Sequence, residues 1–434
     1  MTKQHYESYK ETGNPWLGKV PSEWQVRRAD FVIKSRKLQI SPSELENRDV
    51  YHFAIPTVQA TGAGAVEEGE SIDSGKLIIN EPQVLVSKLN PRKATVAVAE
   101  PHPDYLTVAS TEFVPLIPWE ADLNYMFYVW KSQKVTDRLA SFVQSVTRSH
   151  QRCDPAEITK IPWAWPSQDQ QQKIAAFLDR KTAEIDTLIA KKHRLLDRLA
   201  EKRTALITRA VTKGLNPDAP MKDSGIEWLG EIPAHWDVAR LKNITQLESG
   251  HTPSKSKPEF WVDCDIPWVS LRDTKLLADN DYISQTHTYI NKAGLAGSSA
   301  RLLPAGTVIF TRDATVGLVS ITEVEMAVSQ HLIAWIPSEK IDKDYLLFVF
   351  EAMRDYLHSL EFGSTVRTIG MDDIRRLVGP VPPVREQLEV VDFVLAERDR
   401  LKNLEARVNE AIEKLQEYRS ALITNAVTGQ IKVD

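Results

Sequence analysis

The chain contains two copies of one long segment. The Trp-Leu-Gly sequence at 16–18 returns at 228–230, and the block at 203–208 returns at 419–424. The distance between the copies is too long for the stacked repeats of a solenoid, whose units run to a few tens of residues. The repeat therefore predicts two copies of a whole domain with its connector, and an approximate two-fold internal symmetry.

The two copies agree at their ends and differ in between. The middles match only in places, such as 110–118 with 329–337 and 125–129 with 345–349. A shared scaffold with different middles is what two recognition domains for two different targets would show. Neutral drift after a duplication is the alternative explanation.

Two segments show the heptad pattern of long helices. Ser167 to Gly214 contains no proline or internal glycine, and its apolar residues recur every seven positions, with Lys192 as a polar exception. The second copy keeps this register, and a sustained heptad pattern favours a coiled-coil seam. The predicted seam residues are Leu178, Ile185, Leu188, Leu195, Leu199 and Leu206 in the first segment, and Val394, Leu401, Leu404, Val408, Leu415 and Leu422 in the second.

The charges of these two segments favour pairing with each other. Ser167 to Gly214 carries eleven Lys and Arg against six Asp and Glu, whereas Val384 to Asp434 carries eight against ten. Opposite balances suit a mutual pair, and the domain between the segments gives the chain room to turn round. We expect an antiparallel pair, with the two globular domains at opposite ends of a rod.

The predicted fold class is α+β, with two similar mixed α/β globular domains separated by a long antiparallel two-helix coiled coil in a pseudo-two-fold internal repeat. The predicted boundaries are 1–166 for the first domain, 167–214 for the central helix, 215–383 for the second domain and 384–434 for the distal helix and tail. Short apolar runs bounded by proline predict strands in both middles. One helix is expected near the end of each domain, at 125–142 and 345–362.

Composition restricts the location and the chemistry of the chain. Cys153 and Cys264 lie far apart without a CxxC motif, which favours a reducing compartment and opposes a structural metal site or a disulfide framework. No apolar run approaches 18 residues and no signal-peptide core is evident, so we expect a cytoplasmic protein with no membrane partner. The net charge of −5 counts mildly against nucleic-acid binding.

No catalytic motif is found. The stretch 69–77 resembles a phosphate-binding loop but has five residues between its glycines where four are needed, and Leu77 where a hydroxyl must bind magnesium. No HExxH or GxSxG motif occurs, and Asn14-Pro15 and Asn90-Pro91 lack the sequence expected for adenine methyl transfer. We therefore expect a binding protein with no catalytic residues, no metal and no cofactor of its own.

The diverged middles carry basic and hydroxyl side chains in glycine- and proline-rich loops. Such side chains contact base edges and phosphates in DNA complexes, and solvated surface loops are the alternative interpretation. The candidate DNA-binding residues of the first domain are Lys88, Arg92, Lys93, Arg148, His150 and Arg152. Those of the second domain are His251, Thr252, Ser254, Lys255, Lys257, Ser270, Arg272, Arg312, Thr315, Ser364, Thr365 and Arg367.

Several motifs together resemble the specificity subunits of type I restriction–modification systems, over essentially the whole chain. They are Trp-Leu-Gly-x-x-Pro-x-x-Trp at 16–24 and 228–236, Gly-His-Thr-Pro-Ser at 250–254, Ile-Pro-Trp-Val-Ser at 266–270, Arg-x-Ala-x-Val-Gly at 312–317, Gly-Ser-Thr at 363–365 and Pro-Pro-Val-Arg-Glu-Gln at 382–387. The first domain departs from this pattern. Gln59 to Gly62 replaces the Ser-Leu-Arg-Asp stretch that the second domain has at 270–273. Residues 145–148 stand where the second domain has Gly-Ser-Thr, and 167–171 replaces the Val-Arg-Glu-Gln of 384–387.

The resemblance implies a non-catalytic subunit in which each globular domain is a target-recognition domain for one half of a split DNA sequence. It implies that the paired helices set the unread gap between the halves. It also implies two methyltransferase subunits as partners, which would use S-adenosylmethionine, and translocase–nuclease subunits in the full complex. Two similar heads on a rigid spacer fit the half-site geometry of dimeric DNA-binding proteins.

Two other functional classes remain open from the sequence. A coiled-coil scaffold whose end domains bind proteins would explain the rod and the missing catalytic motifs, but not why the middles diverge while the ends stay alike. A bifunctional enzyme with an unfamiliar active site in one middle is the other.

Overall fold

The computed structural model describes residues 5–145, 151–363 and 365–433. The chain divides into two compact units, with Met1–His193 and Asn409–Asp434 in unit 1 and Arg194–Val408 in unit 2. Two long helices, α5 (Gln168–Lys213) and α11 (Val384–Val427), each contribute to both units. The compact units therefore divide the helices, whereas the boundaries predicted from the sequence keep each helix whole. No described helix is both long enough and apolar enough to cross a membrane.

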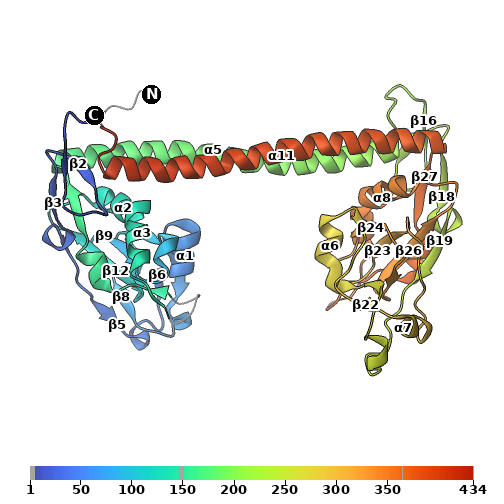
Figure 1. Cartoon of the computed structure of the whole chain (residues 1–434), viewed down its shortest axis with the longest axis horizontal. Helices are drawn as coiled ribbons and strands as arrows, with labels where there is room; N and C mark the ends of the chain where they lie inside the picture. Colours follow the sequence, from blue (N-terminus) through green and yellow to red (C-terminus); the bar gives the residue numbers. More distant parts are fainter. Residues whose placement is uncertain (1–4, 146–150, 364, 434) are drawn as a thin grey trace. The chain divides into compact units, whose positions relative to one another are not determined.

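Unit 1 contains two larger sheets (Figure 1). One has the order β10-β9-β12-β4 and the other the order β5-β8-β11-β6-β7, in which β6 and β11 run parallel. The strands are β4 (Ile33–Lys34), β5 (Gln39–Ile40), β6 (Asp49–Phe53), β7 (Ala65–Glu68), β8 (Lys76–Ile78), β9 (Gln83–Ser87), β10 (Val96–Ala99), β11 (Leu106–Ser110) and β12 (Phe113–Pro118).

Short strand pairs and helices complete unit 1. The pairs are β1 (Tyr9–Glu11) with β2 (Lys19–Pro21), β3 (Gln25–Arg28) with β15 (Pro162–Trp165), and β13 (Gln144–Ser145) with β14 (Gln151–Arg152). The helices are α1 (Ile55–Thr61), α2 (Leu123–Lys131), α3 (Gln133–Ser141) and α4 (Pro155–Thr159).

Unit 2 repeats the plan of unit 1. Its sheets have the orders β19-β26-β23-β24-β21 and β22-β20-β25, and β20 and β25 run parallel as β6 and β11 do. The strands are β19 (Thr245–Ser249), β20 (Ile266–Val269), β21 (Tyr282–Ile283), β22 (Tyr289–Ile290), β23 (Val308–Thr311), β24 (Val319–Thr322), β25 (Ala327–Val328) and β26 (Leu332–Pro337).

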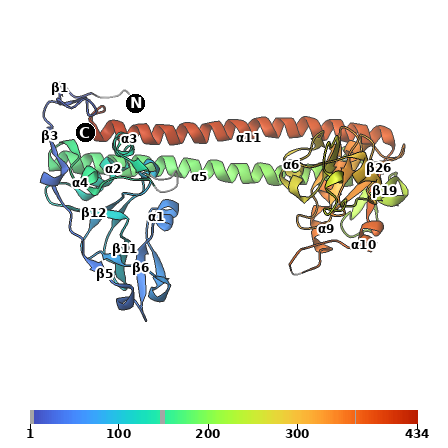
Figure 2. The ribbon, with the colours of Figure 1, turned by 60° about the horizontal axis from the view of Figure 1, so that its bottom comes forward.

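Unit 2 is completed in the same way as unit 1. The outer pairs are β16 (Met221–Asp223) with β17 (Glu231–Pro233), and β18 (Asp237–Arg240) with β27 (Val378–Val381). The helices are α6 (Thr274–Asp279), α7 (Lys292–Ala296), α8 (Lys343–Ala352), α9 (Arg354–Ser359) and α10 (Met371–Arg376). Figure 2 shows α9 and α10 near β19 and β26, whose core they join through Leu357 and Ile374.

One central strand in each unit packs between two apolar cores. In β9, Val84 and Val86 face one core and Leu85 faces the other. In β23, Val308 and Phe310 face one core and Ile309 faces the other. Successive residues of a strand point to opposite faces, so a strand buried on both faces has a continuous apolar run instead of alternation.

The single helix expected near the end of each domain is instead two helices. In unit 1, α2 ends before Ser132, which adopts an extended backbone conformation and whose hydroxyl accepts a hydrogen bond from the backbone N–H of Val135. Serine is a preferred N-cap residue, so it starts α3 rather than continuing α2. In unit 2, the break between α8 and α9 falls at Met353.

Opposite ends of the two long helices meet in each unit. In unit 1, Leu178 and Ile185 of α5 share a core with Leu422 of α11, and Arg419 Nε lies 2.9 Å from Asp186 Oδ1. In unit 2, Ile207 of α5 shares a core with Val394 of α11. The first part of α5 therefore lies with the last part of α11, and the last part of α5 with the first part of α11.

The seam between these helices differs from the predicted one at three positions. Leu188, Leu195 and Leu404 are exposed, with relative accessibilities of 47%, 39% and 41%. The main stripe is buried at Leu178, Ile185, Leu199, Val394, Leu401, Val408 and Leu422, and Leu206 and Leu415 are partly buried.

The second stripe lies four residues after the main stripe rather than three. Ile189 and Leu196 of α5 are partly buried and Ile412 of α11 is buried. With 3.6 residues per turn, positions three and four residues ahead flank a stripe on opposite sides. The heptad pattern identifies the stripe, and the position of the partner helix selects which flank is covered.

Candidate functional site

Polar loops meet at one edge of the sheets of unit 2. The strand register places the end of β23 beside the start of β26, with Thr311 opposite Leu332, and the end of β19 beside the same strand. The ends of β20 and β25 lie together, because these two strands are parallel. We call the segments 250–252, 312–315, 329–331 and 366–369 at this edge the unit 2 junction.

Three backbone hydrogen bonds join the segments 312–315, 329–331 and 366–369 of the unit 2 junction. Arg312 N donates to His331 O at 3.0 Å, Ala314 N to Arg367 O at 2.8 Å, and Ile369 N to Arg312 O at 3.0 Å. Ala314 has a φ of 64°, in the left-handed region, which turns the loop after β23 back toward 366–369.

Unit 1 contains the same three hydrogen bonds in the same arrangement. Lys88 N donates to Glu112 O at 3.0 Å, Asn90 N to Gln151 O at 2.7 Å, and Cys153 N to Lys88 O at 3.0 Å. Asn90 is also left-handed, with a φ of 49°. We call 88–90, 110–112 and 151–153 the unit 1 junction.

The backbones of the two junctions correspond, but their side chains do not. The strand pairings and these hydrogen bonds equate Lys88 with Arg312, Leu89 with Asp313, Thr111 with Gln330, Glu112 with His331, Gln151 with Arg367, and Arg152 with Thr368. One scaffold therefore presents two different sets of hydrogen-bond donors and acceptors.

Asp313 is the centre of the polar network in the unit 2 junction. Its carboxylate accepts hydrogen bonds from Thr368 Oγ1, from His331 Nδ1 at 2.6 Å and from Arg312 Nε at 3.3 Å. Burial alone would raise the pKa of Asp313, but the hydrogen bonds from Thr368 and His331 and the charge of Arg312 lower it. Asp313 is therefore a fixed anion that orients the side chains around it.

Glu112 has the corresponding central place in the unit 1 junction. Arg152 donates to both of its carboxylate oxygens, from Nε and Nη2, at 3.0 Å each. Lys88 Nζ lies 3.9 Å from the same carboxylate and donates to Thr111 O at 3.2 Å. Two predicted DNA-binding residues are thus brought together here around an acidic side chain.

The remaining candidates of unit 1 lie close to this junction in the chain. Arg92 and Lys93 are exposed in a 3-10 turn, Pro91–Lys93, that follows Asn90 directly. Arg148 and His150 lie outside the described residues.

Among the candidates of unit 2, Ser364 also lies outside the described residues. Thr365 is exposed in the loop before Thr368, and Thr315 is exposed after Ala314.

The loop 250–257 covers one side of the unit 2 junction. A Cβ added at Gly250 would lie 1.9 Å from Val328 O, so only glycine allows this approach. Trp268 Nε1 donates to His251 O at 3.1 Å, and Trp261 Nε1 donates to Ser254 O at 3.1 Å. The loop is thereby tied down while His251, Ser254, Lys255 and Lys257 remain exposed and Thr252 is half-buried.

Ser270 is a correction to the predicted contacts. Its residue accessibility is 6%, and its hydroxyl accepts from Arg272 N and bonds to Asp273, so it caps the 3-10 helix Leu271–Asp273. Arg272, in the middle of that helix, is exposed. Strand pairing equates Val269 with Phe53, which places Ala54 at the position of Ser270, so Gln59 to Gly62 is not the counterpart of this stretch.

Arg312 is also less exposed than its loop position suggested, with 21% of its side chain accessible, because it packs against Asp313. Arg367 is 73% accessible and pairs with Glu361 at 3.3 Å. The junction residues that the sequence reasoning missed are Glu112, Asp313, Gln330, His331 and Thr368. Each lies within the matching segments 110–118 and 329–337 or within one residue of a predicted candidate. Glu112, Asp313 and Gln330 are acidic or amide residues and therefore fell outside a search for basic and hydroxyl side chains, whereas His331 and Thr368 lie outside the motifs that the search followed.

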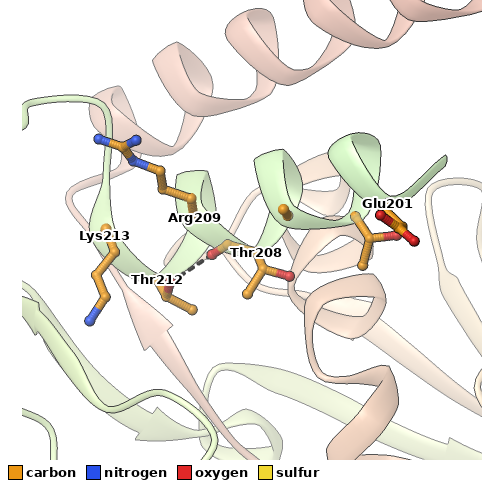
Figure 3. Close-up of a pocket in the computed structure, with 7 residues that line it drawn as sticks. Glu201, Thr208, Arg209, Thr212 and Lys213 are labelled. Carbon is orange, nitrogen blue, oxygen red and sulfur yellow. Dashed lines mark hydrogen bonds between the residues drawn. The ribbon is translucent and has the colours of Figure 1, made fainter. Parts of the chain in front are cut away.

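A shallow hollow of about 600 Å³ lies on the surface of α5 in unit 2 (Figure 3). Its lining falls largely in the repeated block of the sequence, because 203–208 and 210–212 recur at 419–424 and 426–428. The lining residues are Glu201, Thr204, Ala205, Thr208, Arg209, Thr212 and Lys213. At the equivalent positions of α11, Glu417 and Ala421 are exposed as Glu201 and Ala205 are.

A second hollow of about 960 Å³ lies in unit 2 between α5, α11 and the globular part. Arg398 Nη2 crosses it to Asp281 at 3.0 Å and to Glu351 at 3.7 Å. Burial raises the pKa of Glu351, and the charge of Arg398 opposes that shift. These ion pairs across the hollow connect α11 to the globular part of unit 2, so we assign the hollow a structural role.

Comparison with known proteins identifies relatives that are named as specificity subunits of type I restriction enzymes. Residues 233–414 match the family model of the type I restriction modification DNA specificity domain. The MjaIX specificity subunit of Methanocaldococcus jannaschii is 31% identical over 43% of each chain, and the putative MjaX specificity subunit of the same organism is 23% identical over 98% of this chain and 97% of its own. The EcoR124I/EcoR124II specificity subunit of Escherichia coli is 25% identical over 60% of each chain.

Solved structures share the fold. The HsdS subunit of Thermoanaerobacter tengcongensis superposes with a TM-score of 0.56 at 16% identity, over 95% of this chain and 98% of its own. A chain from a study of complex assembly and conformational transition of the type I R-M system superposes with a TM-score of 0.72 at 16% identity, over 94% of this chain and 98% of its own. The predicted resemblance and the mixed α/β content are confirmed. The relatives are named as specificity subunits.

Proposed function

The chain is similar in sequence and in fold to the specificity subunits of type I restriction–modification enzymes, and from this premise we propose that each of its units reads one half of a bipartite DNA target. Unit 1 and unit 2 then act as two target-recognition domains of mixed α/β fold. The subunit has no catalytic role of its own and directs partner subunits to DNA.

The two junctions are the observation that carries this proposal. They share three backbone hydrogen bonds and differ in the side chains at equivalent positions, such as Lys88 with Arg312 and Glu112 with His331. Base pairs in the major groove differ in their pattern of donors and acceptors, so different side chains on one scaffold select different sequences. Drift without selection would not require the junction backbone to remain the same.

We further propose that α5 and α11 form one antiparallel coiled coil that sets the unread gap between the two half-sites. The helices have 46 and 44 residues. At 1.5 Å per residue each is about 65–70 Å long. The pairing of the first part of α5 with the last part of α11, and the reverse in unit 2, supports an antiparallel arrangement within one chain.

We propose the repeated block on the helices as the docking surface for two methyltransferase subunits. Glu201 and Ala205 are exposed and line the shallow hollow of α5, where Figure 3 labels Glu201. Glu417 and Ala421 are exposed at the equivalent positions of α11. Two equivalent surfaces would bind two copies of the same partner. In the complete assembly these partners would use S-adenosylmethionine, translocase–nuclease subunits would join them, and the complex would act in the cytoplasm.

The overall charge of the chain is compatible with this assembly. At −5 the chain alone provides little net attraction for phosphates. Because phosphate neutralisation dominates the affinity of proteins for DNA, the partner subunits would supply much of the positive charge. We therefore expect weak binding by the isolated chain and strong binding by its complex with methyltransferase subunits.

Selection from a pool of randomised duplexes tests the proposal. The full chain, alone and with the methyltransferase subunits of its host, is expected to enrich two short motifs separated by a gap of fixed length and free sequence. Enrichment of one contiguous motif would contradict the two-unit arrangement. Recovery of no motif with either preparation would favour the alternative of a coiled-coil scaffold whose end domains bind proteins.

A further inference from the structure

Gln330 occupies an unusual place in the unit 2 junction, because both functional atoms of its amide are held by other side chains. Thr252 Oγ1 donates to Gln330 Oε1 at 2.5 Å. Gln330 Nε2 lies 3.3 Å from His331 Nε2. The side chain is nevertheless exposed at the junction surface. An exposed glutamine normally samples many rotamers, so these two contacts remove much of the entropy that it would otherwise lose on binding.

The hydrogen-bond partners determine which atom donates and which accepts in the contacts that join Asp313, His331, Gln330 and Thr252. The carboxylate of Asp313 only accepts, so His331 Nδ1 donates to it. In the neutral imidazole the other ring nitrogen is an acceptor, so His331 Nε2 accepts from the Gln330 amide. The hydroxyl of Thr252 then donates to the amide oxygen. The orientation of the amide follows from this chain of contacts, which begins at the fixed anion Asp313.

These contacts leave the Gln330 amide with a defined pair of unused positions. A primary amide has two N–H donors and two acceptor lone pairs. The contacts to Thr252 and His331 use one of each. Among the contacts of the described residues, one N–H donor and one acceptor lone pair therefore remain on the same planar group.

We propose that Gln330 reads an adenine in the half-site bound by unit 2. Adenine presents an N7 acceptor and an N6 amino donor side by side in the major groove, and glutamine pairs with both at once. The remaining N–H of Gln330 matches N7, and the remaining lone pair matches the amino group. Thr252, His331 and Asp313 are positioning residues that hold the amide in the required plane. This inference rests on the proposed function.

The equivalent position in unit 1 supports a difference between the two half-sites. Thr111 takes the place of Gln330, and Glu112 takes the place of His331. Thr111 lacks an amide, so it cannot form the two-bond contact with adenine. We therefore expect the half-site of unit 1 to lack an adenine contact of this kind at the corresponding position.

Randomised-duplex selection with the full chain and its methyltransferase partners tests the inference, with Gln330→Ala and Gln330→Glu as variants. Both side chains lack the amide donor, so one A·T pair of the unit 2 half-site should become degenerate in each. A bidentate contact discriminates by about 1–3 kcal/mol. At 1.4 kcal/mol per tenfold, this is a loss of roughly 5- to 150-fold in preference. The other positions and the whole unit 1 half-site should keep their preferences.

A matched control and a positioning variant separate the possible outcomes. Gln246→Ala changes an exposed glutamine at the start of β19, away from the junction at its end, and should leave both half-sites unchanged. Thr252→Val should lower the preference at the same A·T pair by a smaller factor without affecting other positions. Unchanged thermal unfolding of the variants would show that they fold.

Two results would overturn the inference in distinguishable ways. If the wild-type complex selects a bipartite motif and Gln330→Ala selects the same one, Gln330 does not read a base and the proposed function stands. The same conclusion follows if the wild-type unit 2 half-site contains no A·T pair. If the wild-type complex selects no motif, the proposed function itself fails.

Discussion

Replacing Asp313 by asparagine should weaken unit 2 and disturb only its half-site. The carboxylate of Asp313 accepts hydrogen bonds from Thr368, His331 and Arg312, and only 13% of its side chain is accessible. Asparagine has nearly the same shape, but it is neutral and presents an amide N–H₂ group where one oxygen accepted. One donor therefore meets another donor, and the remaining contacts lose their charge assistance.

The size of the effect follows from these contacts. Hydrogen bonds to charged groups contribute about 1.5–3 kcal/mol and neutral ones about 0.5–1.5 kcal/mol. Three contacts in one network do not add independently, so we expect a loss of about 2 kcal/mol in the free energy of unfolding. For a unit of roughly 200 residues, each kcal/mol shifts Tm by about 2–4 °C, which predicts a decrease of about 4–8 °C for unit 2.

The assay combines thermal unfolding of the full chain with randomised-duplex selection by the assembled complex. Asp313→Asn should lower the unfolding transition of unit 2 and weaken preference in one half-site while the other stays intact. The control is Asp372→Asn, because Asp372 is 80% accessible and its pair with Arg375 at 3.4 Å is solvated and worth little. The reasoning is refuted if Asp313→Asn and Asp372→Asn unfold alike and select the same two half-sites as the wild type.

Three further outcomes are expected. Leu199→Asp buries an unpaired charge at the helix seam and should lower the free energy of unfolding by about 3 kcal/mol or more. Leu195→Asp is the control at an exposed position and should change it by less than about 0.5 kcal/mol, with chemical denaturation measuring both variants. Arg312→Ala and Lys88→Ala should each reduce affinity for one half-site only, and equal loss on all sequences in a binding titration would make them phosphate contacts. Because the folded-state pKa of Asp313 is below its ordinary value of 3.8, its contribution is present above that pH and is lost as the pH falls through the folded pKa. The stability difference between wild type and Asp313→Asn should therefore be constant between about pH 7 and pH 5 and shrink below about pH 4, and urea titrations over that range measure it.

The long-range organisation of the chain could be predicted from the sequence because it depends on repetition. The Trp-Leu-Gly motifs and the heptads are visible in the order of residues alone, and they indicated two similar parts with long helices. The main stripe containing Leu178 and Leu199 was identified in the same way. Periodicity could not show which flank of that stripe the partner covers, so Leu188 and Leu195 were assigned to a seam from which the structure excludes them.

The site was harder to predict because it is assembled from loops that are distant in sequence. Arg312 and His331 are joined by a backbone hydrogen bond that follows from the antiparallel pairing of β23 with β26, and no local pattern encodes that pairing. Selecting basic and hydroxyl residues found Arg312 but missed Asp313 and Gln330. It also included Ser270, because a serine that caps a helix and a serine on a binding surface look the same in a sequence.

The length of the gap between half-sites tests the account most directly. One heptad of matching sequence inserted after His193 in α5 and after Val408 in α11, where the chain divides into its two units, would lengthen both helices and keep the seam in phase. Seven residues add about 10.5 Å. At 3.4 Å per base pair this corresponds to about three base pairs.

The measurement is binding or methylation by the assembled complex on duplexes that differ only in gap length. The account predicts that the preferred gap grows by about three base pairs, with the two half-sites unchanged. Some affinity should be lost at the new optimum, because the added DNA also turns by about 100° at 10–10.5 base pairs per turn. A preferred gap that stays at its wild-type length would show that the helices do not set the spacing and would contradict the proposal.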